Sequence, residues 1–418
     1  TTKLIPENEN NYKMIEDIKK ELTIDNPEYI DKIRRKTWIG NTPMKIKLYE
    51  VKNNSLITGP GFISRLGSGM DYNILLESNN ENCNINFKGK LYKYQNRVFD
   101  LIYNYFKDRG YFRGIISSPT GSGKTIMAVA IAAMTNKKVL WLVNSNDLME
   151  QAVEAFNKFT LQECGRLNAS NKQHIDNFNI CVSTIQTLQK LTDNEFDLIN
   201  NIYDCVIVDE CHHTPAKYFT EALSKLTPVF MLGLTATPIR KDGMQEQMFN
   251  ILGDIIYQIN RDELKESLIF PKVEIIKIRE LIECFVSSDN YIEYLKEVVF
   301  NQRRFDITLE IFKKYHKQTA LILVEFVELG EMYKNEIQKL FPNKTVEFVH
   351  GSMKKVDRKR IIQDTRDGKI DILIGTKLAR EGLDIPILNE LFLFTPKKGD
   401  STKDIANGTT LEQEIGRI

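Results

Sequence analysis

Residues 114–134 constrain the fold more than any other stretch of this sequence. A short apolar run at 114–117 leads into a loop rich in glycine and serine at 118–123, and an apolar helical pattern begins near Thr125. A buried strand that turns through glycines into a helix is the opening of a β-α-β unit. Because the next strand of such a unit is parallel to the first, the rest of the chain has to supply further strands and helices.

Apolar runs of strand length alternate with helical patterns along most of the remaining chain. The runs are 139–143, 180–183, 205–208 and 230–234 in a first series and 273–278, 320–324, 345–349, 370–374 and 390–394 in a second, and helices are expected at 147–159 and 355–367. The alternation of strand and helix patterns is interrupted at 264–271. The pattern therefore predicts an α/β protein with two parallel-sheet domains in tandem.

The first 88 residues follow a different pattern. Residues 12–22 have the apolar spacing of a helix, residues 45–51 alternate like a strand, and Gly59-Pro60-Gly61 predicts a turn. We therefore expect a small α+β accessory domain at 1–88, a first α/β domain at 89–262 and a second at 263–418.

Composition excludes several other classes of protein. At 418 residues the chain is too long for one hydrophobic core, and its hydrophobic and charged fractions of 42% and 27% are typical of globular proteins. No apolar run reaches the roughly 18 residues that cross a bilayer, and the first residues do not resemble a signal sequence. The six cysteines lack the paired spacing of metal ligands. We expect a cytosolic, reducing location, no membrane partner and no zinc site.

The formal net charge of +1 does not indicate nucleic-acid binding by itself. A nucleic-acid site on this chain would have to be a local patch or groove, since backbone amides and hydroxyls can also contact phosphates.

The loop at 119–125 has the sequence P-T-G-S-G-K-T. Backbone N–H groups of such a loop surround a β-phosphate, and the helix that follows adds a favourable dipole. Lys124 would reach the β- and γ-phosphates, and Thr125 would bind Mg²⁺. Ser118 stands where the strict pattern has its first glycine. The predicted ATP-binding residues of the loop are Thr120, Gly121, Ser122, Gly123, Lys124 and Thr125.

Asp209 and Glu210 end the apolar run at 205–208. Beside a phosphate loop, Asp209 can hold Mg²⁺, and Glu210 can orient and deprotonate the attacking water. Alone, an Asp-Glu pair is a weak signal because acidic residues often end strands. Its position after the phosphate loop makes the prediction specific.

Further polar segments follow in chain order. Thr235 and Thr237 come at the end of the run at 230–234 and could sense the γ-phosphate, although hydroxyls there could equally stabilise a loop. The segment 375–386 follows the run at 370–374, and Gln413 and Arg417 lie at the end of the sequence. An arginine from a second domain can stabilise the charge of a phosphoryl group in transfer.

Taken together, these motifs resemble those of superfamily 2 helicases, which have two RecA-like domains with ATP between them. The resemblance runs from about Tyr94 to Arg417 and includes the D-E-x-H form at 209–212. The segments L-G-L-T-A-T-P-I-R-K-D-G at 232–243 and R-E-G-L-D-I-P at 380–386 are similar to the XPB-type and phage UvsW-type DNA branch. The resemblance implies two tandem RecA-like parallel-sheet domains, and residues 26–49 resemble the accessory domain of phage branch-migration helicases.

The resemblance also implies roles for individual residues. Tyr94 and Gln95 would read adenine, and His212 would couple ATP to motion together with Thr235 and Thr237. Gln413 and Arg417 would face the γ-phosphate as catalytic residues beside Lys124, Asp209 and Glu210. Gly382 and Asp384 would bind the nucleotide, with Asp384 near the ribose. The residues expected to contact nucleic acid are Ser145, Thr184, Gln186, His350, Gly351 and Thr376.

The chain departs from the family pattern at three places. Asn144-Ser145 stands where Pro-Thr is frequent, and Tyr92 stands where a basic residue is frequent. The last motif usually carries a second arginine three residues after the first, but the sequence stops at Ile418. We therefore expect the natural protein to continue beyond this residue, so that the second α/β domain is truncated here.

These observations predict an ATP- and Mg²⁺-dependent DNA helicase or translocase that unwinds or branch-migrates forked, Holliday-junction or loop DNA. We expect a monomer in the cytosol, including that of a phage-infected cell. An RNA helicase is the nearest alternative, although the sequence has N-S-N-D-L at 144–148 where such proteins usually have Pro-Thr-Arg-Glu-Leu. A motor subunit of a larger restriction or repair complex also remains open, as does an ATP-binding scaffold without motor activity. Arg34-Arg35-Lys36 with Trp38 is a candidate for an additional duplex contact.

Overall fold

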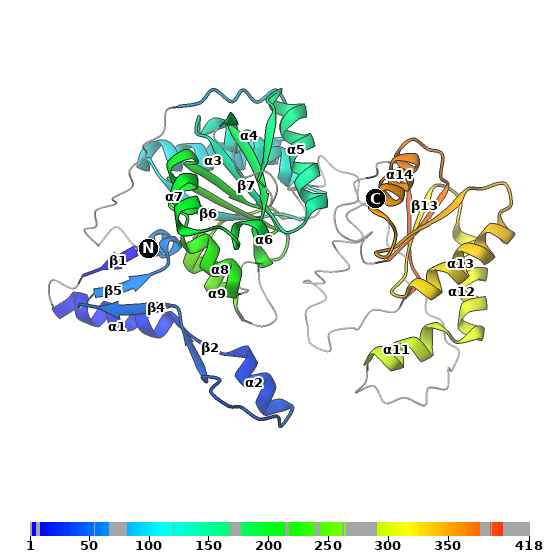
Figure 1. Ribbon diagram of the computed structural model, residues 1–418, viewed down its shortest axis with the longest axis horizontal. Helices are drawn as coiled ribbons and strands as arrows, with labels where there is room; N and C mark the ends of the chain where they lie inside the picture. The colour runs from blue at the N-terminus through cyan, green and yellow to red at the C-terminus, as the bar shows by residue number, and fades with distance from the viewer. Residues whose placement is uncertain are drawn as a thin grey trace. The chain divides into compact units, whose positions relative to one another are not determined.

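The computed structural model describes residues 2–5, 9–53, 55–66, 82–119, 121–167, 177–213, 217–238, 243–260, 263–264, 291–376, 385 and 387–395 (Figure 1). The chain divides into two compact units, Thr1–Leu268 and Ile269–Ile418. Among the described helices, none combines the length and the apolar character that a membrane span requires.

The larger unit contains a seven-stranded sheet in its described part, with the strand order β12-β6-β11-β10-β7-β9-β8. All neighbouring pairs in this sheet are parallel. The strands are β6 (Phe112–Ser117), β7 (Val139–Val143), β8 (Cys164–Leu167), β9 (Ile180–Thr184), β10 (Cys205–Val208), β11 (Phe230–Thr235) and β12 (Ile255–Gln258). The parallel arrangement brings the carboxyl ends of β6, β10 and β11 to one edge of the sheet.

Helices cover both faces of this sheet (Figure 1). One face carries α3 (Lys93–Arg109), α4 (Lys124–Met134) and α5 (Asn146–Thr160), and the other carries α6 (Ile185–Leu188), α7 (Asp193–Ile202), α8 (Lys217–Ser224) and α9 (Gln245–Leu252). The sequence of β7 is apolar throughout because its side chains alternate between the two faces of the sheet, both of which are buried. Val139, Trp141 and Val143 belong to the core under α4, whereas Leu140 and Leu142 belong to the opposite core.

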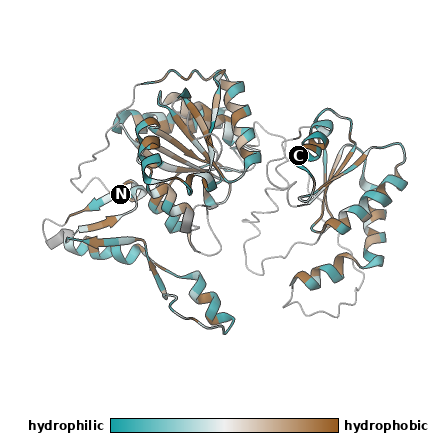
Figure 2. Ribbon diagram, in the orientation of Figure 1, coloured by the Kyte–Doolittle hydropathy of each residue, from teal (hydrophilic) through white to brown (hydrophobic). Residues whose placement is uncertain are grey.

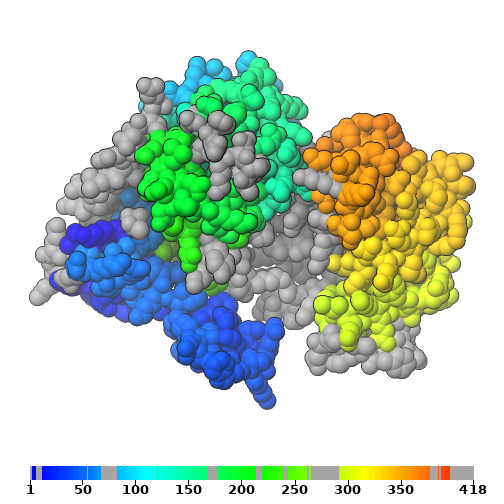
Figure 3. All heavy atoms as spheres, viewed as in Figure 1, coloured from blue at the N-terminus to red at the C-terminus, as the bar shows by residue number. Residues whose placement is uncertain are grey.

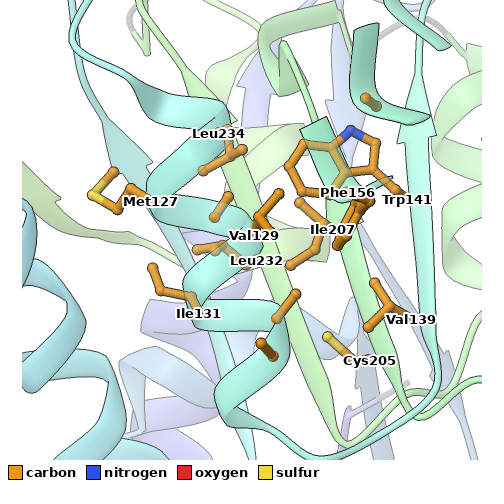
Figure 4. Close-up of a cluster of buried hydrophobic side chains, with 14 of the residues drawn as sticks. Met127, Val129, Ile131, Val139, Trp141, Phe156, Cys205, Ile207, Leu232 and Leu234 are labelled. Carbon is orange, nitrogen blue, oxygen red and sulfur yellow. The ribbon is translucent and has the colours of Figure 1, made fainter. Parts of the chain in front are cut away.

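Trp141 is fully buried in the first core (Figure 4). Its ring meets that of Phe156 edge to face, with centroids 5.2 Å apart. Val129 of α4, Ile207 of β10 and Leu232 of β11 are buried in the same cluster. This packing holds α4 against β10 and β11. Hydropathy follows the same layering, since the strands are hydrophobic and the helices carry hydrophilic residues on their outer sides (Figure 2).

The smaller unit contains a parallel sheet with the order β14-β15-β13-β16 in its described part. Its strands are β13 (Ala320–Leu323), β14 (Val346–Val349), β15 (Ile372–Gly375) and β16 (Glu390–Leu393), and its helices are α11 (Tyr291–Val299), α12 (Gln302–Tyr315), α13 (Val327–Leu340) and α14 (Lys355–Arg366). The predicted strand at 273–278 lies outside the described residues. Two parallel sheets in tandem confirm the predicted α/β class.

The N-terminal segment is an α+β structure of two small antiparallel sheets, β1-β5-β4 and β2-β3. Its elements are β1 (Thr2–Leu4), α1 (Glu9–Glu21), β2 (Thr23–Asp25), α2 (Pro27–Arg34), β3 (Lys45–Lys47), β4 (Tyr49–Lys52), β5 (Ser55–Thr58) and the 3₁₀-helix η1 (Pro60–Arg65). The single strand expected at 45–51 is divided at Leu48, whose N–H donates to Leu22 O at 2.8 Å. The predicted turn at 59–61 is the start of η1.

The N-terminal segment packs on α9 of the first α/β layer, where the blue and green segments adjoin (Figure 3). Arg65 donates to Asp254 Oδ1 at 2.8 Å and forms ion pairs with Glu21 and Glu246 at 2.6 and 3.0 Å. Asn250 of α9 donates to Leu48 O at 2.9 Å. These contacts fix the N-terminal segment to the end of the helix that follows β11.

Candidate functional site

The phosphate loop connects β6 to α4 and is hydrogen-bonded to β11 and α3. Gly121 and Gly123 have φ angles of 79° and 71°, in the left-handed region that favours glycine. Ser118 N–H donates to Thr235 O of β11 at 2.9 Å, and the Ser118 and Ser122 hydroxyls form a very short hydrogen bond. Thr120 lies outside the described residues. The predicted strand, loop and helix are therefore present, with α4 beginning at Lys124.

Tyr94 and Gln95 of α3 lie beneath the loop, and each is 1% exposed. The Tyr94 hydroxyl donates to Ser122 O at 2.6 Å. The Gln95 amide donates to Ser122 O at 3.0 Å and to Gly123 O at 3.3 Å. Their predicted contact with adenine stays a prediction, and the contacts seen in the structure brace the loop.

Lys124 is placed for an anionic ligand. Its Nζ lies 3.6 Å from Glu210 Oε1, and its side chain is 11% exposed. Nζ is buried and has no hydrogen-bond partner among the residues that the structure describes. A buried ammonium that lacks hydrogen bonds is unfavourable, and phosphate oxygens would supply the acceptors. The residues present thus fit the triphosphate of ATP.

Asp209 and Glu210 follow β10 at the edge of the sheet. Burial, with the neighbouring Glu210 carboxylate as the second cause, raises the pKa of Asp209 to about 6. Asp209 Oδ1 accepts a hydrogen bond from Glu210 N–H at 2.9 Å. Glu210 has a φ of 48°, which costs backbone strain in a non-glycine residue. A divalent cation would favour the charged form of Asp209 and offset the cost of its burial.

Mg²⁺ fits this set of donors together with a nucleotide. The described residues contain no group of three or more His, Cys, Asp or Glu side chains that could hold a metal ion alone. Mg²⁺ retains water ligands and is usually held by one or two carboxylates with substrate phosphates. Thr125, in the first turn of α4, and Asp209 are the protein groups that would hold it.

A chain of contacts leads from Glu210 to the end of β11. His212 Nδ1 lies 3.3 Å from Glu210 Oε2 and 3.0 Å from Thr235 Oγ1. Thr235 Oγ1 also accepts a hydrogen bond from Thr237 N–H at 3.0 Å. The structure therefore brings together the residues expected to couple ATP to motion. Their coupling role stays a prediction.

Asn144 is a site residue whose role the sequence alone did not indicate. Its side-chain Nδ2 donates to Glu210 O at 3.3 Å, and its backbone carbonyl accepts from Gln186 Nε2 at 3.0 Å. Asn144 thus supports the strained Glu210 and joins it to a residue expected to contact nucleic acid. Its position directly after β7 could have indicated that it lies near Glu210, because β7 pairs with β10 and Glu210 follows β10.

The hydroxyls of Ser145 and Thr184 serve as helix caps. Ser145 Oγ accepts from Leu148 N–H at the start of α5, and Thr184 Oγ1 accepts from Thr187 N–H at the start of α6, each at 3.3 Å. These bonds give both residues a structural role beside the predicted contact with nucleic acid.

The smaller unit brings His350, Gly351 and Thr376 to the carboxyl ends of β14 and β15. Thr376 N–H donates to Val349 O at 3.2 Å. The His350 ring stacks on Phe348 with centroids 5.0 Å apart. Within the described residues, its buried Nδ1 has no hydrogen-bond partner. The predicted site residues Gly382, Asp384, Gln413 and Arg417 lie outside the described part of the chain.

Two family descriptions match the sequence. Residues 88–240 match "Type III restriction enzyme, res subunit", and residues 303–418 match "Helicase conserved C-terminal domain". These two regions include the phosphate loop of the larger unit and the β14 and β15 ends of the smaller unit.

Several curated proteins are similar to this chain. A candidate helicase, helicase 22, of a Sulfolobus islandicus filamentous virus is 28% identical and covers 73% of this chain and 57% of the viral protein. The Drosophila melanogaster helicase/translocase subunit XPB of general transcription and DNA repair factor IIH is 24% identical, covering 83% of this chain and 44% of that protein. A candidate ATP-dependent RNA helicase, L396, of Acanthamoeba polyphaga mimivirus is 26% identical, covering 79% and 62%. The chain spans about half the length of these relatives.

Proposed function

This chain belongs to the superfamily 2 helicases and resembles the XPB type, and from that premise we propose that it couples ATP hydrolysis to movement along nucleic acid. The observation that carries the proposal is the buried Lys124 ammonium, which lies beside Glu210 at the start of the helix after the phosphate loop. This arrangement suits a polyanion, and the neighbouring carboxylates supply groups for hydrolysis.

Each residue of the site has a chemical task in this proposal. Lys124 would bind phosphate oxygens, while Thr125 and Asp209 would hold Mg²⁺, which would neutralise charge on the phosphates. Glu210 orients the water and accepts its proton, because its carboxylate is fixed between Lys124 and His212. Thr235 and Asn144 carry changes at Glu210 toward the loops expected to hold nucleic acid.

DNA is the nucleic acid that we propose as the substrate, in forked, Holliday-junction or loop form. The proposal draws on the similarity to an XPB protein of a DNA repair factor and on the motifs at 232–243. RNA is the second candidate, and the similarity to the mimivirus protein named as an RNA helicase favours it. Roles in replication, recombination or repair follow only if branched DNA is the substrate.

The N-terminal lobe at 25–47 offers a surface for duplex DNA. α2 buries none of its residues, and Trp38 is 87% exposed. The lobe contains six basic and three acidic residues, although the whole chain carries only +1. An exposed aromatic ring among basic side chains suits phosphates and stacked bases.

ATP hydrolysis tests the proposal directly. The rate is measured without nucleic acid and with single-stranded DNA, a four-way DNA junction or RNA. We expect junction DNA to raise the rate severalfold and Lys124→Ala to abolish it. The matched control is Lys158→Ala, an exposed lysine on α5 of the same unit. Stimulation by RNA alone would reassign the substrate, and hydrolysis that persists in Lys124→Ala would refute the site.

A further inference from the structure

Asn144 lies opposite Glu210, just beyond the ends of two paired strands. The register of β7 and β10 sets Val208 beside Leu142, so the residues two positions further on are level with each other. Asp209 N–H donates to Leu142 O at 2.9 Å, which continues the pairing past the end of β10. Asn144 Nδ2 donates to Glu210 O at 3.3 Å. This bond orients the amide, because a carbonyl acceptor requires the nitrogen.

The bond from Asn144 acts on a strained backbone. Glu210 has a φ of 48°, and such a conformation persists only where the surrounding contacts fix it. Its carboxylate lies 3.6 Å from Lys124 Nζ and 3.3 Å from His212 Nδ1. Asn144 bonds to the main chain of Glu210 and can turn this carboxylate without touching it. Asn144 is therefore a positioning residue for the group that accepts the proton of water.

The other half of the Asn144 amide is not satisfied. Its Oδ1 is buried and has no hydrogen-bond partner within the described part of the chain. A buried acceptor without a donor is unfavourable, and an amide placed for stability alone would use both of its ends. The single bond that Asn144 does make is the one to Glu210. The residue is thus better suited to controlling Glu210 than to holding the fold together.

Gln186 connects Asn144 to the surface. This glutamine is exposed on α6, and its Nε2 donates to the backbone carbonyl of Asn144 at 3.0 Å. α6 directly follows β9, and the sheet has the order β10-β7-β9. The ends of three neighbouring strands therefore carry Glu210, Asn144 and Gln186 in a row. A phosphate or base that bound the Gln186 amide would compete with the Asn144 carbonyl for it.

We propose that Asn144 transmits nucleic-acid binding at Gln186 to Glu210. When nucleic acid takes the Gln186 amide, the Asn144 carbonyl loses its donor, and the turn after β7 changes the bond that holds Glu210. This gives the ATP site a route on the side of β7, separate from the contacts of His212 with Thr235 at the end of β11. The inference rests on the proposed function, because it concerns how nucleic acid regulates the same site.

The stimulation of ATP hydrolysis by DNA tests the inference. The stimulation factor is kcat with a saturating four-way DNA junction divided by kcat without DNA. We expect Asn144→Leu and Gln186→Ala each to lower this factor by about 2- to 30-fold, the range of coupling between residues of one network. The KM for ATP should change little, because Lys124 and the phosphate loop are intact. Anisotropy of a labelled junction shows that DNA binding is saturated in each variant.

The double variant separates one shared route from two independent effects. If Gln186 acts through Asn144, the double variant should have the same stimulation factor as Asn144→Leu alone. If the two residues act independently, their effects multiply. Gln189→Ala, on the last turn of the same helix, and Asn146→Leu, at an exposed residue of α5, are the matched controls and should leave the factor unchanged.

Two results would overturn the inference. One is an unchanged stimulation factor in Asn144→Leu, and the other is multiplied effects in the double variant. Should Asn144→Leu fail to fold, Gln186→Ala decides by itself, because its side chain is exposed and an unchanged factor there removes the first step of the route. A wild-type protein that DNA does not stimulate would refute the proposed function as well, whereas a stimulated wild type with unaffected variants would refute this inference alone.

Discussion

At the scale of single residues, the candidate site is a set of groups held in unfavourable states. Lys124 is a buried ammonium, Glu210 has a left-handed backbone, and burial raises the pKa of Asp209 to about 6. Such states are common where a protein is arranged for a ligand rather than for its own stability. Each of them has a consequence that can be measured without the ligand.

Asp209 should lower the stability of the ligand-free protein at neutral pH. Folding raises the pKa of this carboxyl from 3.8 to about 6, so the folded state favours the protonated form. The ionised carboxylate therefore destabilises the folded protein fully above pH 6, and this destabilisation vanishes as the pH falls toward 3.8. We expect Asp209→Asn to raise the free energy of unfolding by about 1–2 kcal/mol at pH 7.5, and the gain to shrink at pH 5. Chemical denaturation followed by the fluorescence of buried Trp141 measures it.

Asp306→Asn, at an exposed residue of α12, is the control and should change the free energy of unfolding by less than about 0.5 kcal/mol. The ATPase of Asp209→Asn should be lost despite its greater stability. A variant that is less stable than the wild type at pH 7.5 would contradict this account of Asp209.

His316 should make the smaller unit sensitive to acid. Burial lowers the pKa of His316 below its usual 6.5, although its Nδ1 lies 2.8 Å from Glu390 Oε2. A histidine with a lowered pKa binds fewer protons when folded than when unfolded, so stability falls as the pH drops below about 6.5. Calorimetry at pH 7.5 and 5.5 should show a larger fall in Tm for the wild type than for His316→Gln. Equal falls would exclude His316 as the cause.

Local motifs could be predicted from the sequence because their residues are neighbours in the chain. The loop before Lys124 and the Asp209–Glu210 pair follow apolar strands, so their place at a sheet edge follows from the pattern alone. The contact between Gln95 and Ser122 joins residues that are 27 positions apart, and only the fold brings them together. Long-range hydrogen bonds of this kind leave no periodic signal in the sequence.

At the scale of elements, α9 connects two parts of the larger unit. It follows the segment that contains Thr235 and Thr237, and it packs against η1 of the N-terminal segment. The sequence predicted the parallel strands at 205–208 and 230–234 because their apolar runs are clear, but it did not predict the helix α9. It did not predict the division of 45–51 at Leu48. Alternation is interrupted there, since Leu48 and Tyr49 are both apolar, but the hydrogen bond to Leu22 O that accompanies the division comes from a distant element.

Asn250 should be the polar residue on which this junction depends most. It is 7% exposed, donates to Leu48 O at 2.9 Å and accepts from Gly59 N–H at 3.1 Å. Asn250→Ala leaves both groups without partners, so we expect a loss of about 2–4 kcal/mol in the free energy of unfolding. Asn250→Asp retains the acceptor and should lose less. Denaturant titration would show the order, and equal losses would contradict the proposed pairing.

At the scale of the whole molecule, charge is unevenly distributed. The chain is almost neutral at +1, whereas the lobe at 25–47, with six basic and three acidic residues, carries a formal net charge of +3. Several of its cations are paired, including Arg34 and Arg35 with Asp31. A local basic surface on a neutral chain predicts nucleic-acid binding that depends on few phosphate contacts.

Salt titration tests this lobe. Replacing Lys36 by alanine should weaken binding of duplex DNA and reduce the slope of log K against log salt concentration by about 1, because one phosphate contact is lost. Trp38→Ala should weaken binding with little change in slope. Ile292→Ala, an exposed apolar residue on α11, is the control. Fluorescence anisotropy between 50 and 200 mM salt provides the measurement, and an unchanged slope in Lys36→Ala would place the duplex elsewhere.

The close packing of η1 on α9 also limits how the protein can change by descent. A Cβ on Gly61 would collide with the backbone of Gly253, and Arg65 depends on Glu246 and Asp254 for its charge balance. Residues on the two sides of this junction can therefore change only together. A recombination event that exchanged the N-terminal segment between relatives would therefore also have to exchange the segment from α9 to β12. The two segments are far apart in the sequence, since Gly59 and Asn250, which are hydrogen-bonded across the junction, are separated by 191 positions.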